Sequence, residues 1–132
     1  MKTVFVNGTF DIIHRGHLEL LNYAKSRGYV IVGIDTDECV RGKKGRGRTV
    51  HNQEERKFFL ENLKAVNEVR FFSSDKELEN LVKSVDPDIM IVGSDWKGKS
   101  VIGSYHAAKL IFFDRIGDYA TTKTIEDIIN RR

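Results

Sequence analysis

Short apolar runs alternate along the chain with longer segments whose apolar residues recur every three or four positions. The runs predict strands at residues 2–6, 29–35, 66–72, 89–93 and 110–114. The segments with helical spacing predict helices at residues 17–28, 52–66, 75–85 and 121–132. This alternation predicts an α/β fold: a single Rossmann-like domain over residues 1–132, with a five-stranded parallel sheet and helices on both faces.

Residue types that favour helix ends support these boundaries. Gly28 closes the first helical segment, as glycine commonly does. Asn52 is suited to cap the second helix, because its side chain accepts hydrogen bonds from the free N–H groups of a first turn. Thr121 or Thr122 would cap the last helix in the same way. Pro87, the only proline, follows the third helix and prevents its continuation.

The composition narrows the class of protein. Hydrophobic residues make up 40% of the 132 residues, and no apolar run approaches the ~20 residues that a membrane helix needs. The chain enters strand-like sequence within its first few residues, so we expect no secretory signal. Cys39 is the single cysteine, which argues against a disulfide framework and is typical of a reducing cytosol. We therefore expect a cytoplasmic protein without membrane insertion.

A basic stretch, "RGKKGRGR" at residues 41–48, follows the second predicted strand. The formal net charge of the whole chain is only +3, so this stretch concentrates positive charge locally. It is either a solvated surface loop, a site for an anionic ligand or a nucleic-acid patch. No aromatic residue is interleaved with the charges, and this argues against nucleic acid as a partner.

The segment "NGTFDIIHRGHLELL", residues 7–21, carries two histidines where the first predicted strand gives way to the first helix. Ligands of open α/β sheets bind at such junctions. His14 and His17 flank Gly16, which has no side chain to hinder a ligand, and the helix start offers free N–H groups to a phosphate. A zinc site is the competing interpretation, but the sequence supplies no further ligand at a familiar spacing. The pattern favours a phosphate site.

The residues "GTFDIIHRGH" closely resemble the first signature of the cytidylyltransferase-like nucleotidyltransferases, which carry an H-x-G-H motif. Three later segments resemble further signatures of that family in the same order: "RTVHNQEERK" at 48–57, "VGSDWKGK" at 92–99 and "DRIGDYATTKTIEDI" at 114–128. The resemblance spans nearly the whole chain. In length and design the chain is most similar to the glycerol-3-phosphate cytidylyltransferases.

The resemblance implies that residues 1–132 form a nucleotidyltransferase domain, which joins a nucleoside triphosphate to a small phosphorylated compound and releases pyrophosphate. Mg²⁺ would accompany the triphosphate, without a metal site built from protein ligands. The implied catalytic residues are His14, His17, Lys43, Lys44 and Arg56. Asp37 and Arg56 would bind the second substrate. The implied nucleotide-binding residues also include Gly8, Thr9, Phe10, Asp11, Gly16, Asp95, Trp96, Arg115, Thr121 and Thr122.

Several of these residues have a structural alternative. Asp11 is as well suited to capping the turn as to binding a ligand, and Trp96 to packing on the surface. Thr9 and Phe10 would shape the turn, and the Thr9 hydroxyl or N–H could reach a phosphate. The last signature departs from the family pattern R-T-E-G-I-S-T-[ST], because Asp118 replaces its glycine and Ala120 its serine. The lost serine removes a hydroxyl that could bind phosphate.

The sequence leaves two alternatives for the pair of substrates. Trp96 and Arg115 favour CTP, with glycerol 3-phosphate as the acceptor and CDP-glycerol as the product. "GRGRTVHNQEER" and "VIGS" at 101–104 instead resemble adenylyltransferases that act on heptose 1-phosphate. A protein that binds a nucleotide but turns it over weakly is a third reading, given Asp118 and Ala120. Family resemblance also implies a homodimer.

Overall fold

A computed structural model describes residues 1–43, 49–114 and 120–131. Its strands are β1 (Thr3–Gly8), β2 (Tyr29–Asp35), β3 (Glu68–Phe72), β4 (Ile89–Gly93) and β5 (Lys109–Phe113). Its α-helices are α1 (Arg15–Arg27), α2 (Asp37–Lys43), α3 (Gln53–Glu61), α4 (Asp75–Val85) and α5 (Thr121–Asn130). Two 3₁₀ turns, η1 (Ser94–Trp96) and η2 (Ser104–His106), lie between β4 and β5. The predicted strands and helices are present.

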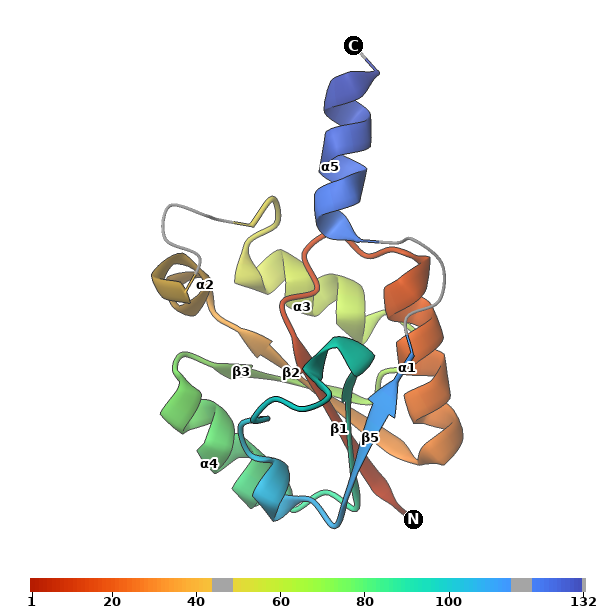
Figure 1. Cartoon of the computed structure of the whole chain (residues 1–132), viewed down its shortest axis with the longest axis vertical. Coiled ribbons are helices and arrows are strands. Elements are labelled where there is room, and N and C mark those ends of the chain that lie inside the picture. The colour runs from red at the N-terminus through yellow and green to blue at the C-terminus, as the bar shows by residue number, and fades with distance from the viewer. Residues whose placement is uncertain (44–48, 115–119, 132) are drawn as a thin grey trace.

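The strands form one parallel sheet in the order β3-β2-β1-β4-β5 (Figure 1). Val4 of β1 lies opposite Val30 of β2 on one side and Ile89 of β4 on the other. The chain therefore builds the sheet outward from β1 in one direction, and then crosses to the other side of β1 to form β4 and β5. The predicted α/β fold with a five-stranded parallel sheet is confirmed, and its strand order reverses between β1 and β4.

Helices cover both faces of the sheet because successive strand residues point to opposite sides. On one face Val4 and Val6 pack with Leu21 of α1 and Leu60 of α3. On the other face the strand residues pack against α4. The members of that second cluster include Phe5, Phe72, Leu78, Val82 and Met90. This double burial explains why the strands read as continuous apolar runs rather than alternating ones.

Helix α2 was missed by the sequence analysis, which treated residues 41–48 as a loop. Residues 41–43 instead form the last part of α2, and residues 44–48 lie outside the described part of the chain. The Thr36 hydroxyl accepts a hydrogen bond from the Cys39 N–H at 3.3 Å. Asp37 and Glu38 fill the first turn, where a helix favours negative charge. A threonine followed by two acids was the signal for this helix start.

Two other helix ends differ from the expectation. Asn52 caps α3 by accepting from the Glu55 N–H at 2.9 Å, as predicted, but the helix stops at Glu61 rather than at residue 66. Tight turns follow it, and they bring Ala65 and Val66 into the core. The N-cap of helix α5 is Ala120, whose side chain cannot form a capping hydrogen bond. The prediction that Thr121 or Thr122 caps this helix was therefore wrong. Within the described residues no helix is long and apolar enough to span a membrane.

Candidate active site

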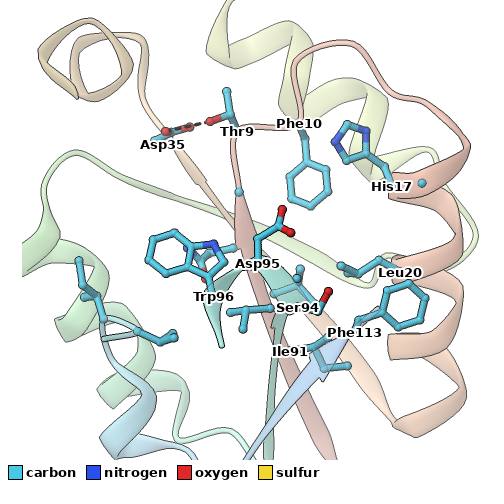
Figure 2. Close-up of a pocket in the computed structure, with 18 of the residues that line it drawn as sticks. Thr9, Phe10, His17, Leu20, Asp35, Ile91, Ser94, Asp95, Trp96 and Phe113 are labelled. Atoms are coloured by element: carbon cyan, nitrogen blue, oxygen red, sulfur yellow. Dashed lines mark hydrogen bonds between the residues drawn. The ribbon is translucent and has the colours of Figure 1, made fainter. Parts of the chain in front are cut away.

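A pocket opens at the carboxyl edge of the sheet, where the strand order reverses between β1 and β4. Its volume is about 490 Å³, within the usual range for small-molecule sites. Its floor is formed by the ends of β1 and β4, and its walls by the β1–α1 turn, η1 and the chain before η2 (Figure 2). Open α/β sheets bind ligands at this point of strand reversal. The fold thus places the pocket where the sequence predicted a site.

His14 and His17 form a stacked pair at the amino end of α1. Their ring centroids are 3.8 Å apart and their planes are inclined by 21°. Phe10 lies against His17, with 5.0 Å between the ring centroids. His14, Gly16 and His17 all line the pocket. The H-x-G-H motif therefore presents two imidazoles and the start of a helix to one cavity.

The surroundings of His17 determine its charge and its tautomer. Burial, and secondarily the neighbouring His14, lower the pKa of His17 from 6.5 to about 4. The backbone N–H of His14 donates to His17 Nδ1 at 3.2 Å. A neutral imidazole that accepts at Nδ1 carries its proton at Nε2. At neutral pH His17 is thus an uncharged hydrogen-bond donor through Nε2.

The turn between β1 and α1 has an unusual backbone at Phe10, whose φ is 52°. A non-glycine residue in this left-handed region is strained, and neighbours must hold it in place. A Cβ at Gly8 would come within 2.9 Å of the Phe10 ring, so the ring can lie there only over a glycine. The Thr9 hydroxyl donates to Asp35 Oδ2 at 3.2 Å. Its proton is committed to Asp35, which argues against the predicted use of this hydroxyl as a phosphate donor.

Arg56 is fully buried beneath this turn. Its Nη1 donates to the carbonyl oxygens of Thr9 at 3.0 Å and Asp35 at 2.9 Å. Its Nε donates to the His51 carbonyl at 3.2 Å, and its Nη2 to Asp37 Oδ1 at 2.9 Å. Arg56 therefore joins four segments, and its donors face protein atoms. This geometry argues against the prediction that Arg56 contacts the triphosphate or the acceptor, because Arg56 lies beneath the turn and binds the segments around it.

Asp11 and Asp37 also bind neighbouring backbone. Asp11 accepts from the N–H groups of Val50 and His51 at 2.8 and 2.9 Å. Asp37 accepts from Arg56 and from the Gln53 N–H at 3.1 Å. Neither residue lines the pocket. The geometry favours the structural alternative for Asp11, which holds the segment after residue 48 rather than its own turn. It also argues against the predicted substrate contact of Asp37.

The opposite wall of the pocket contains the predicted residues Asp95 and Trp96, both in η1. Figure 2 shows the Asp95 carboxylate pointing into the cavity between the β1–α1 turn and Trp96. Trp96 is 49% exposed, and Lys99 Nζ lies 6.0 Å from the centroid of its ring. Trp96 therefore lies at the surface and lines the pocket with a cation beside its ring, which is compatible with both the nucleotide-binding and the surface-packing alternatives.

The remaining predicted residues are only partly described. Lys44 and Arg115 lie outside the described residues, as does Asp118. The backbones of Lys43 and Thr121 are the end of α2 and the first residue of α5, and Thr122 is exposed. Sequence reasoning missed Asp35, Val101 and Ile102, which line the pocket. Asp35 could have been found, because it is the polar last residue of an apolar strand.

The family description "Cytidylyltransferase-like" matches residues 5–124. The chain belongs to this family. Its members are nucleotidyltransferases, and the pocket with its histidine pair occupies the expected ligand crevice. The predicted family is thereby confirmed.

Curated relatives from several bacteria carry the name "Bifunctional protein HldE". The protein of Sulfurimonas denitrificans is 44% identical over 96% of this chain and 27% of its own length. Those of Nitratiruptor sp. and Helicobacter pylori are 41% and 37% identical over 95% and 96% of the chain, and over 27% and 28% of their own lengths. The chain thus spans about a quarter of these relatives. They do not support the narrower resemblance to glycerol-3-phosphate cytidylyltransferases.

Two solved structures share the fold. The lipopolysaccharide core biosynthesis protein of Thermoplasma volcanium matches with a TM-score of 0.69 and 25% identity, over 91% of this chain and 99% of that chain. Thermotoga maritima TmcAL bound with alpha-thio ATP also gives a TM-score of 0.69, at 14% identity, over 99% of this chain and 51% of that chain. At 14% identity, the similarity to TmcAL shows a shared fold only.

Proposed function

We propose that this nucleotidyltransferase is an adenylyltransferase that transfers AMP from ATP to heptose 1-phosphate or a similar sugar phosphate. The observation that carries the choice is the set of HldE relatives, which match almost the whole chain at up to 44% identity. They favour the adenylyl alternative that the sequence left open over CTP and glycerol 3-phosphate. The structural relative named for lipopolysaccharide core biosynthesis supports a sugar phosphate as the acceptor.

In the proposed reaction an oxygen of the acceptor phosphate attacks the α-phosphorus of ATP. The bond from that phosphorus to the bridging oxygen breaks, and pyrophosphate leaves with the electron pair. An ionised phosphate needs no general base, so catalysis rests on orientation and on stabilising the developing charge. His17 Nε2–H would donate to that charge, and the free N–H groups at the start of α1 would bind phosphate oxygens.

The phosphates also need positive charge. In the part of the chain that the structure describes, the pocket lining includes Asp35 and Asp95 but no lysine or arginine. We propose that Lys43, Lys44 and Arg115, whose side chains lie outside the described part of the structure, supply these cations. The described residues contain no cluster of three or more His, Cys, Asp or Glu that would hold a metal. Mg²⁺ would therefore be held mainly by the triphosphate, where it would neutralise charge between phosphate oxygens.

The surrounding organisation is part of the proposal. Residues 1–132 would act as one nucleotidyltransferase domain, equivalent to about a quarter of the bifunctional relatives. A homodimer is supported by the apolar face of α5, where Ile128 and Ile129 are 59% and 57% exposed. Light scattering of the purified protein would measure its mass in solution. A cytoplasmic location fits substrates that are nucleotides and sugar phosphates.

A pyrophosphate-release screen tests the function. ATP, CTP, GTP and UTP are each combined with heptose 1-phosphate, hexose 1-phosphates and glycerol 3-phosphate in the presence of Mg²⁺. We expect the highest kcat/KM for ATP with heptose 1-phosphate. A His17→Ala variant prepared in parallel gives the background rate.

The other outcomes are equally informative. Preference for CTP with glycerol 3-phosphate would overturn the adenylyl assignment and restore the cytidylyl alternative. Binding of nucleotide without pyrophosphate release from any pair would identify a protein that only binds nucleotide. Binding to DNA or RNA that weakens steeply with salt would instead indicate a nucleic-acid site.

A further inference from the structure

Asp35 is a buried carboxylate that faces the pocket and that the proposed reaction does not yet use. It is the last residue of β2, is 8% exposed and lines the cavity beside Thr9. Figure 2 shows the Asp35–Thr9 pair at one end of the pocket, separate from Asp95 and Trp96. A buried carboxylate is costly unless it is satisfied, and the Thr9 hydroxyl and Arg56 contribute to satisfying this one.

Arg56 and Thr9 hold Asp35 from the side of the protein. Arg56 Nη1 binds the main-chain carbonyl of Asp35 at 2.9 Å, a contact that any residue would supply. Its distance to Asp35 Oδ1 is 3.5 Å, at the limit of a hydrogen bond. The closer ionic partner of Arg56 is Asp37, at 2.9 Å. Asp37 is thus the closer ionic partner of Arg56, and Asp35 also lines the cavity.

The chemistry of a carboxylate restricts what it can bind. It repels phosphate and accepts hydrogen bonds, and its two oxygens together accept about four. It can therefore hold the Thr9 hydroxyl, which donates at 3.2 Å, and still receive hydroxyl groups from a ligand. An acidic residue in a Rossmann-like site commonly binds sugar hydroxyls in this way. The cyclic diols of sugars are the donors in the proposed substrates that suit this group.

We propose that Asp35 is a specificity-determining residue that accepts hydrogen bonds from the hydroxyl groups of a bound sugar. The inference rests on the proposed function, in which two sugars enter the pocket: the ribose of ATP and the acceptor sugar. Both present the same donor chemistry. Repulsion of phosphate by Asp35 orients the ligand, with its hydroxyl-bearing end at Asp35 and its phosphates at His14 and His17.

The test combines substrates that lack one hydroxyl group with a variant that lacks the Asp35 carboxylate. One arm compares ATP with 2′-deoxy-ATP and 3′-deoxy-ATP, and the other compares heptose 1-phosphate with its monodeoxy analogues. In the wild type, loss of the hydroxyl that Asp35 binds lowers kcat/KM about 10-fold or more, because a buried acceptor is left unpaired. In Asp35→Asn, which places an NH₂ donor beside the ligand, the same deletion changes kcat/KM less than about 2-fold.

The arm that responds identifies which sugar Asp35 binds. Asp88→Asn is the matched control, because Asp88 accepts from the Thr3 N–H at the opposite edge of the sheet; it should keep the wild-type ratios. If Asp35→Asn keeps the wild-type ratios in both arms, Asp35 is structural and the inference is wrong. If Asp35→Asn does not fold, Asp35→Glu takes its place in the test. This variant keeps the charge but displaces it, so it should also lower the ratio of kcat/KM between the full substrate and its deoxy analogue.

Failure of the proposed function is distinguishable from failure of this inference. If the wild type uses no sugar phosphate, the proposed function is wrong, but the nucleotide arm of the test can still be carried out. In that case the binding of ATP and of its deoxy analogues is compared by competition. Equal affinity of wild type for ATP and both deoxy analogues, together with inactivity toward the acceptor series, would refute the inference as well.

Discussion

The two strand-to-helix junctions that border the pocket are built in different ways. Between β1 and α1, Arg56 and Asp35 hold the Thr9–Phe10 turn from beneath, and the stacked histidines lie at the start of the helix. After β5, the helix α5 starts at an alanine that provides no side-chain cap. Figure 1 shows α5 projecting away from the sheet, and its isoleucines are largely exposed.

This difference indicates how the pocket divides its tasks. The first junction is preorganised: buried hydrogen bonds keep a strained turn and a neutral His17 in place before any ligand arrives. The second junction begins a ten-residue helix with little cover, and so short a helix is marginal in water without packing. The rigid wall suits the chemical step, while the second junction adds only Ala120 to the described lining of the pocket.

The largest effect should come from removing the support of the first junction. Arg56→Ala leaves the half-buried Asp37 without its ion-pair partner and the carbonyls of Thr9 and Asp35 without a donor. We expect a loss of about 3–5 kcal/mol in the free energy of unfolding, measured by urea titration. Arg70→Ala, which removes an exposed pair with Glu68, should cost less than about 1 kcal/mol. Similar losses in both variants would show that the first junction is not preorganised by Arg56.

The second effect concerns catalysis at the same junction. His17→Ala should lower kcat about 10²–10³-fold, the usual cost of losing one donor to developing charge. Nucleotide affinity should change far less, since the donor acts mainly in the transition state. His106→Ala is the control, because His106 pairs with Glu79 outside the pocket. A His17 variant within a few-fold of wild type would remove this residue from the mechanism.

The third effect is a pH dependence of stability. The unfolded chain protonates His17 below about pH 6.5, whereas the folded chain does so only below about pH 4. Between these values the unfolded state binds more protons, so stability is full above pH 6.5 and falls as the pH drops toward 4. The loss should reach about 2–3 kcal/mol relative to His17→Gln. Parallel stability curves for the two proteins over this range would contradict the buried, neutral His17.

The smallest effect should come from strengthening the second junction. Ala120→Ser restores the hydroxyl found in the family pattern at the N-cap of α5, and a serine cap is worth about 1 kcal/mol over alanine. Amide hydrogen exchange within α5 should slow about 5-fold, while exchange in α1 stays the same. Unchanged exchange in α5 would mean that its start is already held by other contacts.

Periodicity predicted most of the fold because burial on both faces governs these strands. The segments 29–35, 75–85 and 89–93 match β2, α4 and β4 residue for residue. The errors lie where local hydrogen bonds override the apolar pattern. Helix α2 is started by the Thr36 hydroxyl and runs into the basic, glycine-containing stretch, and α3 ends in turns that bring Ala65 and Val66 into the core.

The candidate site was predictable where one segment supplies it, and less so where distant segments meet. The H-x-G-H motif located the pocket, since its residues are neighbours in sequence. The burial of Arg56 could not be read from a helix pattern, because its partners come from segments up to 47 residues away. Asp35 was detectable as a polar residue at the end of an apolar strand, but its contact with Thr9 was not, because only the sheet brings the two residues together.

The parallel sheet also determines how the protein can be attached to a surface. All five strands run in one direction, so Met1, which is fully exposed, lies at the edge opposite the pocket (Figure 1). A tether at the amino end would therefore leave the pocket open to the solution. A tether at the other terminus would pull on α5, whose N-cap is the pocket residue Ala120. Immobilised binding measurements should accordingly attach the protein through its first residue.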